Sequence, residues 1–301
     1  FTGVDKVKGS WAGIFIDAND VKNKLDGVKI EYAGGDQFNS NGDKGAIIIY
    51  AGSKVEVKNC QISNSESYGI NCNYGDCEVV FENNTITTCT MPMFTEAEYV
   101  SSISGGTFTG NDIDVIYIDT YAGAGYVITS QTWADLNVPY RVKAGGNIDV
   151  REVTLTIAAG VEMEFETSAG IVVNDNSALK ALGTATNRIL FTGVDKLPGA
   201  WGSIAFWYTQ SPLNEIGFAT IEYGSDTESR GSVYMWANPV VNVHDVSFQD
   251  LKSCAFYDAP KTQNNPERNP NLTVTNCTYS EVDNQSNYVT DALNSSYCFG
   301  G

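Results

Sequence analysis

The sequence predicts an all-β fold: a right-handed parallel β-helix, or β-solenoid, with two tandem modules. Three observations lead to this prediction. The stretch that begins at Phe1 recurs in the same order from Phe191, short apolar runs alternate with Gly, Asn, Asp and Ser, and helical periodicity is nearly absent. Short strands that repeat one design bury a continuous core when they stack on their neighbours.

The internal repeat defines the modules. Residues 1–14 (FTGVDKVKGSWAGI) match residues 191–204 (FTGVDKLPGAWGSI). Further segments match in the same order: residues 28–32 with 219–223, 46–50 with 232–236, 55–62 with 241–248, and 81–86 with 274–279. We therefore predict module 1 at residues 1–110 and module 2 at residues 111–301, with a linking segment at 111–150. Module 1 has no counterpart of the strand-rich residues 144–190, so we expect the chain to be part of a longer polypeptide or to have lost a preceding segment.

Each module is expected to consist of coils of about 20 to 25 residues, the period of solenoid repeats. VEVKNC at 55–60 and VVFENN at 79–84 are alike and lie one coil apart. Because alternate residues of a strand share one face, the inward residues of stacked coils are expected to form a column. It places Val55, Val57, Cys60 and Ile62 under Val79, Phe81, Asn84 and Ile86. Asn84 would need hydrogen-bonding neighbours in such a column.

The middle of the chain gives the clearest strand pattern. Strands are predicted at residues 153–157, 161–165, 170–173, 178–182 and 189–191. Residues 131–136 are expected to form at most a short helical turn.

The residues from Thr132 onward also resemble a known family. The segments that carry the resemblance are TW at 132–133, PYRV at 139–142, IDV at 148–150, VTLTI at 153–157, LKALGT at 179–184, NRILFT at 187–192 and GAWGSI at 199–204. They are similar to the right-handed parallel β-helix repeat proteins of pectate-lyase-like architecture, which are common among secreted and surface proteins of Bacteroidetes-type bacteria. The resemblance implies an extracellular or cell-surface location. It implies no single function, because the same coil occurs in lyases, hydrolases and adhesins.

Charge and hydropathy argue against two classes of partner. Asp and Glu number 36 against 18 Lys and Arg, and the net charge of −18 repels nucleic acid and anionic membranes. No apolar run reaches the roughly 18 residues that a membrane span needs, so no membrane insertion is expected. The expected partner is a polysaccharide or cell-surface glycan, bound by a monomer or by part of a longer chain.

Aromatic residues form the candidate ligand-binding site. Tyr234 and Trp236 alternate with apolar residues that are expected to point inward, so both should point outward. Trp207 and Tyr208 come from a nearby coil. Exposed aromatic rings on a rigid β face can stack on sugar rings. In the alternative, the loop at 208–215 covers them.

One loop has the pattern of a weak calcium site. Asp36, Asn39, Asn41 and Asp43 place side-chain oxygens around glycines, as hard cations prefer. The equivalent loop at 224–230 lacks the pattern, and a plain Asn/Gly turn is the alternative. No other cofactor is expected.

No catalytic residue is assigned. His244 has no second histidine to act with, and no Asp-Asp pair of the kind found in hydrolases of this fold occurs. Glu162, Glu164 and Glu166 share one strand face and are expected to be a solvated exterior, and no arginine is expected to share a strand register with paired acids. The predicted function is therefore non-catalytic glycan binding or adhesion. The alternative is a polysaccharide lyase or glycoside hydrolase that acts on acidic polysaccharide.

The cysteines have two expected roles. Cys60 and Cys277 fall at equivalent inward positions, where they should act as small buried side chains. Cys72 and Cys77 flank a tight turn and can bridge if the compartment is oxidising. The total of 7 cysteines leaves at least one thiol free.

Overall fold

The computed structural model describes residues 1–20, 22–39, 42–227, 231–259, 268–282 and 297–299. The fold is the predicted all-β parallel solenoid, in which paired strands of successive coils run parallel. Helix within these residues consists of two short 3-10 turns, η1 (Ala97–Ser102) and η2 (Tyr121–Gly123). The chain divides into two compact units: unit 1 is Phe1–Ala124 with Leu136–Tyr140, and unit 2 is Gly125–Asp135 with Arg141–Gly301.

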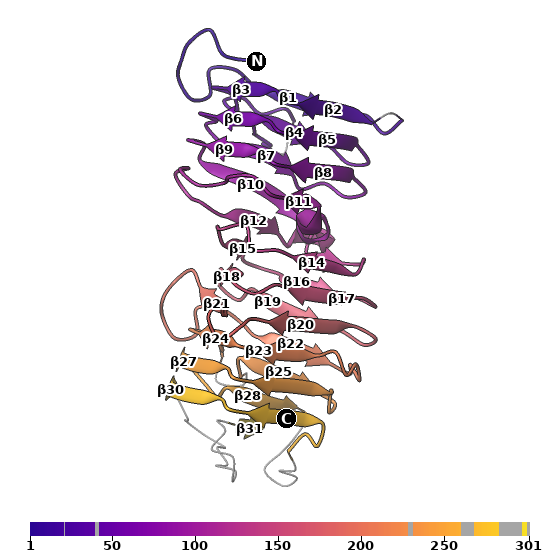
Figure 1. The fold of residues 1–301 in the computed structure, drawn as a ribbon, viewed down its shortest axis with the longest axis vertical. Coiled ribbons are helices and arrows are strands. Elements are labelled where there is room, and N and C mark those ends of the chain that lie inside the picture. Colours follow the sequence, from indigo (N-terminus) through magenta and orange to yellow (C-terminus); the bar gives the residue numbers. More distant parts are fainter. Residues whose placement is uncertain (21, 40–41, 228–230, 260–267, 283–296, 300–301) are drawn as a thin grey trace. The chain divides into compact units, whose positions relative to one another are not determined.

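Unit 1 contains the strands drawn from indigo to magenta in Figure 1. Hydrogen-bonded neighbours follow the orders β1-β4-β7-β10-β12, β2-β5-β8-β11 and β3-β6-β9. The strand bounds are β1 (Ile14–Ile16), β2 (Asn23–Asp26), β3 (Lys29–Glu31), β4 (Ile47–Ile49), β5 (Lys54–Lys58), β6 (Gln61–Ser63), β7 (Tyr68–Cys72), β8 (Glu78–Glu82), β9 (Thr85–Thr87), β10 (Met91–Glu96), β11 (Ile103–Ser104) and β12 (Ile116–Asp119).

Unit 2 continues the same design, with strands drawn from magenta to yellow. Neighbours follow the orders β15-β18-β21-β24-β27-β30, β13-β16-β19-β22-β25-β28-β31 and β14-β17-β20-β23-β26-β29. The strand bounds are β13 (Tyr126–Val127), β14 (Gln131–Trp133), β15 (Tyr140–Val142), β16 (Asn147–Val150), β17 (Thr154–Ile157), β18 (Glu162–Phe165), β19 (Gly170–Val173), β20 (Ala178–Leu182), β21 (Ile189–Gly193), β22 (Ile204–Trp207), β23 (Glu215–Gly217), β24 (Ala219–Glu222), β25 (Val233–Trp236), β26 (Val241–His244), β27 (Ser247–Leu251), β28 (Phe256–Ala259), β29 (Leu272–Thr275), β30 (Thr278–Val282) and β31 (Tyr297–Phe299).

The predicted inward column of unit 1 is confirmed. In-register partners are Val55 with Val79, Val57 with Phe81, and Ile62 with Ile86, all of them buried. Asn84 lies in the same column, and its amide finds the partners that burial demands. Its Oδ1 accepts a hydrogen bond from the Cys60 backbone N–H at 3.0 Å, and its Nδ2 donates to the Val57 carbonyl at 2.8 Å. The polar side chain thus links adjacent coils.

A left-handed residue ends each of the matching strand runs. Asn59 and Asn83 follow β5 and β8 with φ of 53° and 54°, and Asp245 and Asn276 take φ of 53° and 52° at the equivalent places in unit 2. Asn and Asp enter this region at lower cost than other residues with a Cβ, because their side chains bond locally to the backbone. Their place in the sequence therefore sets where the chain turns from one sheet into the next.

The strands predicted in the middle of the chain are present as β17 to β21. The helical turn expected at 131–136 is wrong, because Gln131–Trp133 is the strand β14, paired with β17. Trp133 is fully buried. Its large side chain fills the core from a strand, and packing of this kind overrides a weak local preference.

The repeated tryptophans make the same contact in each unit. Trp11 donates its Nε1 proton to the Glu31 carbonyl at 2.8 Å, and Trp201 donates to the Glu222 carbonyl at 2.8 Å. Matching sequence positions therefore have matching local structure. The boundaries of the modules at residues 110 and 111, and the linking segment, stay predictions.

Candidate functional site

An outward aromatic cluster lies on the sheet that contains β22, β25 and β28. The inward residues Phe206 and Met235 are buried, so the neighbouring Trp207, Tyr234 and Trp236 project from the opposite face. Trp207 at the end of β22 is in register with Trp236 at the end of β25. The parallel ladder therefore brings together aromatic residues that are far apart in sequence.

We call Trp207, Tyr208, Tyr234, Trp236 and Tyr257 the aromatic face. Trp207 and Tyr208 are 41% and 53% exposed. Trp236 donates its Nε1 proton to the Tyr208 hydroxyl at 2.8 Å. Tyr234 stacks on its register partner Tyr257, with ring centroids 5.7 Å apart and planes 9° apart. The structure thus brings the four predicted aromatic residues together and leaves Trp207 and Tyr208 open to solvent.

Tyr257 is the member that sequence reasoning missed. It is mostly buried, and burial raises the pKa of its phenol. Tyr257 follows the inward Phe256 in β28, so strand alternation would have placed it outward. Its stacking on Tyr234 fixes the orientation of that ring.

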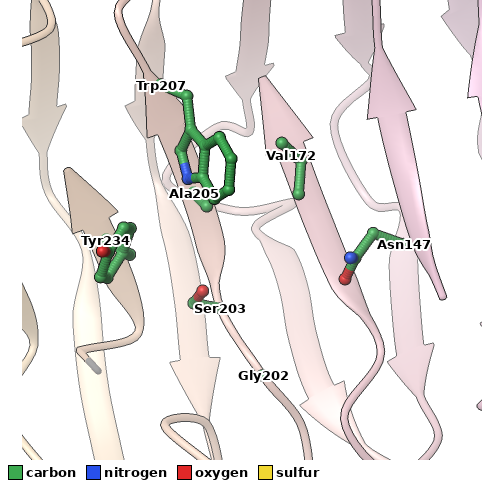
Figure 2. A pocket seen from close by; sticks show the side chains of 7 residues that line it. All are labelled: Asn147, Val172, Gly202, Ser203, Ala205, Trp207 and Tyr234. Carbon is green, nitrogen blue, oxygen red and sulfur yellow. The ribbon is translucent and has the colours of Figure 1, made fainter. Parts of the chain in front are cut away.

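A pocket of about 180 Å³ opens beside the aromatic face. It is lined by Asn147, Val172, Gly202, Ser203, Ala205, Trp207 and Tyr234. Figure 2 shows the Trp207 ring above Ala205, with Tyr234 on one side and Asn147 on the other. The pocket thus combines two aromatic rings, three small residues, one valine and one amide.

The lining carries no carboxylate or ammonium group. Asp149, the register partner of Val172, accepts a hydrogen bond from Arg151 Nε at 2.9 Å. Arg151 also lies over the Tyr126 ring, 3.5 Å from its centroid. The charges on this neighbouring coil are therefore already paired with one another.

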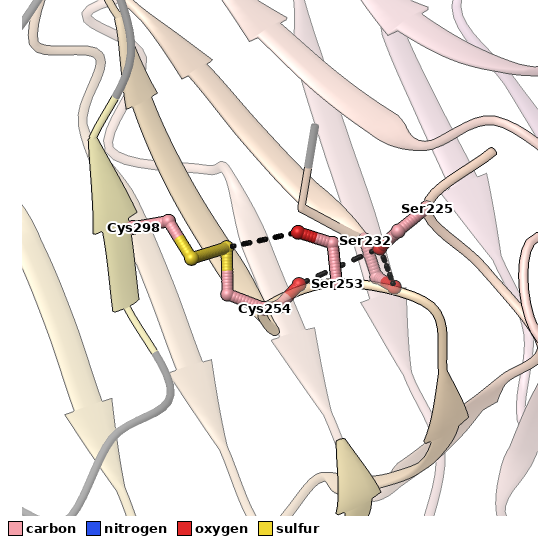
Figure 3. The surroundings of a disulfide bond; sticks show 5 residues. All are labelled: Ser225, Ser232, Ser253, Cys254 and Cys298. Carbon is pink, nitrogen blue, oxygen red and sulfur yellow. Dashed lines mark hydrogen bonds between the residues drawn. A yellow bond between two sulfur atoms is a disulfide. The ribbon is translucent and has the colours of Figure 1, made fainter. Parts of the chain in front are cut away.

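A disulfide lies next to the aromatic face, because Cys298 is the register partner of Tyr257. Cys254 and Cys298 are joined with their Cα atoms 6.0 Å apart, and Figure 3 shows this bridge beside Ser225, Ser232 and Ser253. The two cysteines form one apolar cluster with Tyr257 and Ala259, and Tyr234 and Trp236 pack against it.

The sequence indicated another pair of cysteines for a bridge. Cys72 and Cys77 are free thiols in the structure. A hydrogen bond between them raises the pKa of Cys72 and lowers that of Cys77. Cys60 is buried as predicted, whereas Cys277 is partly exposed.

The predicted calcium loop makes contacts of its own. Asn39 donates to the Tyr74 hydroxyl at 2.9 Å, and Tyr74 in turn donates to the Asp43 carboxylate. Asp36 is exposed, and Asn41 lies outside the described residues. Within the described ranges, no group of three or more His, Cys, Asp or Glu side chains is arranged to hold a metal ion. The calcium site stays a prediction.

The glutamates of β18 differ in part from expectation. They project opposite the buried Val161, Met163 and Phe165, as predicted. Glu164 is not simply solvated, because Arg141 donates to its carboxylate at 2.6 Å and both side chains are mostly buried. Contrary to expectation, an arginine of the neighbouring strand β15 thus pairs with one of these acids.

Other charged groups lie on the same face as Glu164. Lys196 donates to Thr192 Oγ1 at 2.9 Å, and Thr192 donates to Glu222 at 2.7 Å. Burial raises the pKa of Glu162, and Glu164 adds to this effect.

His244 points outward from β26, as predicted. Its Nδ1 lies 2.9 Å from Asp245 and its Nε2 lies 3.3 Å from Glu215. The imidazole and the Phe218 ring are nearly perpendicular, with centroids 5.6 Å apart. His244 therefore belongs to a local polar network and not to the lining of the pocket beside the aromatic face.

No family model, curated protein or solved structure matches this chain. No helix in the described part of the chain is both long and apolar enough to cross a membrane.

Proposed function

We propose that this protein is a non-catalytic, extracellular or cell-surface β-solenoid that binds a glycan at the aromatic face. The observation that carries the proposal is a half-exposed tryptophan, Trp207, beside a small uncharged pocket on a rigid sheet. Large exposed aromatic groups usually mark contact surfaces, and indole and phenol rings combine an apolar face with a hydrogen-bonding edge. Sugar rings present the same combination.

The proposed location rests on three supports. Disulfides such as Cys254–Cys298 persist mainly in oxidising compartments outside the cytosol. The net charge of −18 favours solubility in such surroundings. The sequence resembles bacterial secreted and surface β-helix proteins of pectate-lyase-like architecture, and we include that assignment in the proposal.

The direct test is a glycan array probed with the purified chain and with Trp207→Ala. We expect wild-type binding, and a loss of about tenfold or more in affinity for the variant, because an anchoring aromatic residue commonly contributes 2 kcal/mol or more. Tyr121→Ala is the matched control: Tyr121 is 78% exposed but lies in η2, outside the aromatic face. Equal binding by wild type and Trp207→Ala would contradict the proposal, as would an array without any bound glycan.

A second function has one specific observation in its favour. Arg141 lies on the same sheet as Glu162, Glu164 and Glu222, and Lys196 reaches this sheet from the segment after β21. A lyase or hydrolase acting on acidic polysaccharide could use this combination of charges. Against it, Arg141 already pairs with Glu164, and Lys196 donates to Thr192. Release of unsaturated uronates, followed by absorbance, or of reducing ends would establish this activity in place of the first proposal.

A further inference from the structure

We propose that the glycan bound at the aromatic face is neutral, with one uncharged sugar ring seated in the pocket between Trp207 and Asn147. This inference rests on the proposed glycan-binding function and names its ligand class. It differs from the acidic polysaccharides that the alternative enzyme would require. Three observations support a neutral ligand. The pocket lining is uncharged, the nearby Arg151 is already paired with Asp149, and an uncharged ring occupies the corresponding position in unit 1.

The polar groups that line the pocket are all neutral. Asn147 offers an amide, while Ser203 and Tyr234 offer hydroxyls, so each can donate or accept a hydrogen bond from a sugar hydroxyl. A carboxylate or sulfate in this place would lose water without gaining a cationic partner, and burying an unpaired charge is costly. The lining therefore favours a ligand that carries hydroxyls and no charge.

The neighbouring coil does not offer a spare cation. Arg151 donates to Asp149 from Nε and rests on the Tyr126 ring. An anionic ligand would have to compete with Asp149 for that guanidinium, at a fixed planar geometry. The net charge of −18 adds a long-range repulsion against polyanions.

The size of the pocket matches one ring of a longer chain. Pockets for drug-sized molecules typically measure about 300 to 1,000 Å³, and this pocket has about 180 Å³. The Tyr208–Trp236 pair continues the aromatic surface beyond Trp207 and on to the next strand. Neighbouring strands are about 4.8 Å apart, so a second sugar would find this pair within reach.

In unit 1, aromatic side chains of the chain itself occupy the position that corresponds to Ala205 and the pocket beside it. Phe15 stands at the repeat position of Ala205, and their register partners Ile48 and Tyr234 also match. Phe38 stacks over Phe15, with ring centroids 5.2 Å apart and planes 14° apart. A flat, uncharged ring of the chain itself thus covers this face in unit 1. In unit 2 the small Ala205 leaves room for a ring from outside.

The test compares pairs of ligands that differ only in charge. Isothermal titration of the full chain would use oligosaccharides of glucose, galactose or mannose, each beside the uronate oligomer of the same ring stereochemistry, at low and high salt. We expect at least one neutral oligosaccharide to bind about tenfold or more tightly than its uronate counterpart. Its affinity should hardly change with salt, because no ion pair is formed.

Ala205→Phe tests where the ring is seated. The variant copies Phe15 of unit 1 and fills the pocket, so we expect neutral binding to fall about tenfold or more while the melting temperature stays near that of wild type. Tyr121→Ala should bind as wild type does. If Ala205→Phe binds a neutral oligosaccharide as tightly as wild type does, the sugar ring does not bind in this pocket and that part of the proposal is wrong.

The outcomes separate this inference from the proposed function. Tighter binding of a uronate oligomer that weakens with salt, and that Trp207→Ala abolishes, overturns the neutral ligand class and leaves glycan binding at the aromatic face intact. Binding of no glycan, neutral or acidic, on the array and in titration overturns the proposed function and this inference with it.

Discussion

Glu96 is a partly buried carboxylate among other carboxylates. It ends β10 in register with Asp119 of β12. Burial raises the pKa of Glu96 to about 7, and repulsion from Asp119, Asp76 and Glu98 adds to the effect. The residue thus holds its proton more tightly in the folded chain than in the unfolded one, where a value near 4.5 applies. The consequence is a pH-dependent stability that one side chain controls.

We predict that Glu96→Gln stabilises the protein at pH 8 and changes little at pH 4. Between the unfolded pKa of 4.5 and the folded pKa of about 7, the folded state binds more protons, so the free energy of unfolding falls as pH rises through this window. Above this pH window the full decrease in the free energy of unfolding has occurred. We expect it to be on the order of 1 to 2 kcal/mol, a value reduced because Glu96 is partly exposed. Urea unfolding at both pH values measures it, with the exposed Glu152→Gln as control. A variant no more stable than wild type at pH 8 would refute the prediction.

At the scale of the strand, the sequence predicted best where alternation is strict. In β17 and β18 polar and apolar side chains alternate strictly, and a strand with one buried face has no other register that buries the apolar ones. β14 escaped prediction because Gln131 opens it and a single turn of helix fits so short a segment equally well. Burial of Trp133 in the core favours the strand over the helical turn, and this burial becomes evident only in the folded structure.

The sequence predicted four residues of the aromatic face, but neither Tyr257 nor the pocket beside it. Outward Tyr234 and Trp236 follow from alternation, whereas the pocket depends on Ala205 lying on the strand next to Tyr234, with Gly202 just before that strand. Ala205 and Tyr234 become neighbours only through the register between successive coils, which the sequence does not state directly. The Cys254–Cys298 bridge has the same origin, because it spans a sequence separation of 44 and its partners meet only once the last coils are stacked.

The repeated tryptophans Trp11 and Trp201 make the same hydrogen bond but differ in burial, and this difference provides a prediction. Trp201 is fully buried and stacks on Phe165 with centroids 4.5 Å apart, whereas Trp11 is partly exposed. Replacing either by Phe removes the same hydrogen bond to a backbone carbonyl. We predict that Trp201→Phe lowers the free energy of unfolding by about 2 to 4 kcal/mol, since a cavity adds to the lost bond, and Trp11→Phe by about 1 kcal/mol. Denaturant unfolding of the two variants checks the order, and an equal or reversed loss would show that burial does not set the difference.

At the scale of the whole molecule, each unit has a core of its own. Phe81 is buried in unit 1 and Phe191 in unit 2. In solenoids each coil contacts its neighbours, so stability is close to a sum of local terms and a cavity is felt mainly near its origin. Cooperative unfolding of the entire chain as one two-state unit is therefore not required.

We predict that Phe81→Ala and Phe191→Ala destabilise different parts of the chain, each by about 3 to 5 kcal/mol. Hydrogen exchange followed by mass spectrometry resolves the two, because amides open locally at free energies set by their own region. Exchange should accelerate in peptides of unit 1 for Phe81→Ala and in peptides of unit 2 for Phe191→Ala, with the other unit changed little. If both variants accelerated exchange equally along the whole chain, the two units would have to unfold as a single cooperative body, and the local addition of coil stabilities would not describe this protein.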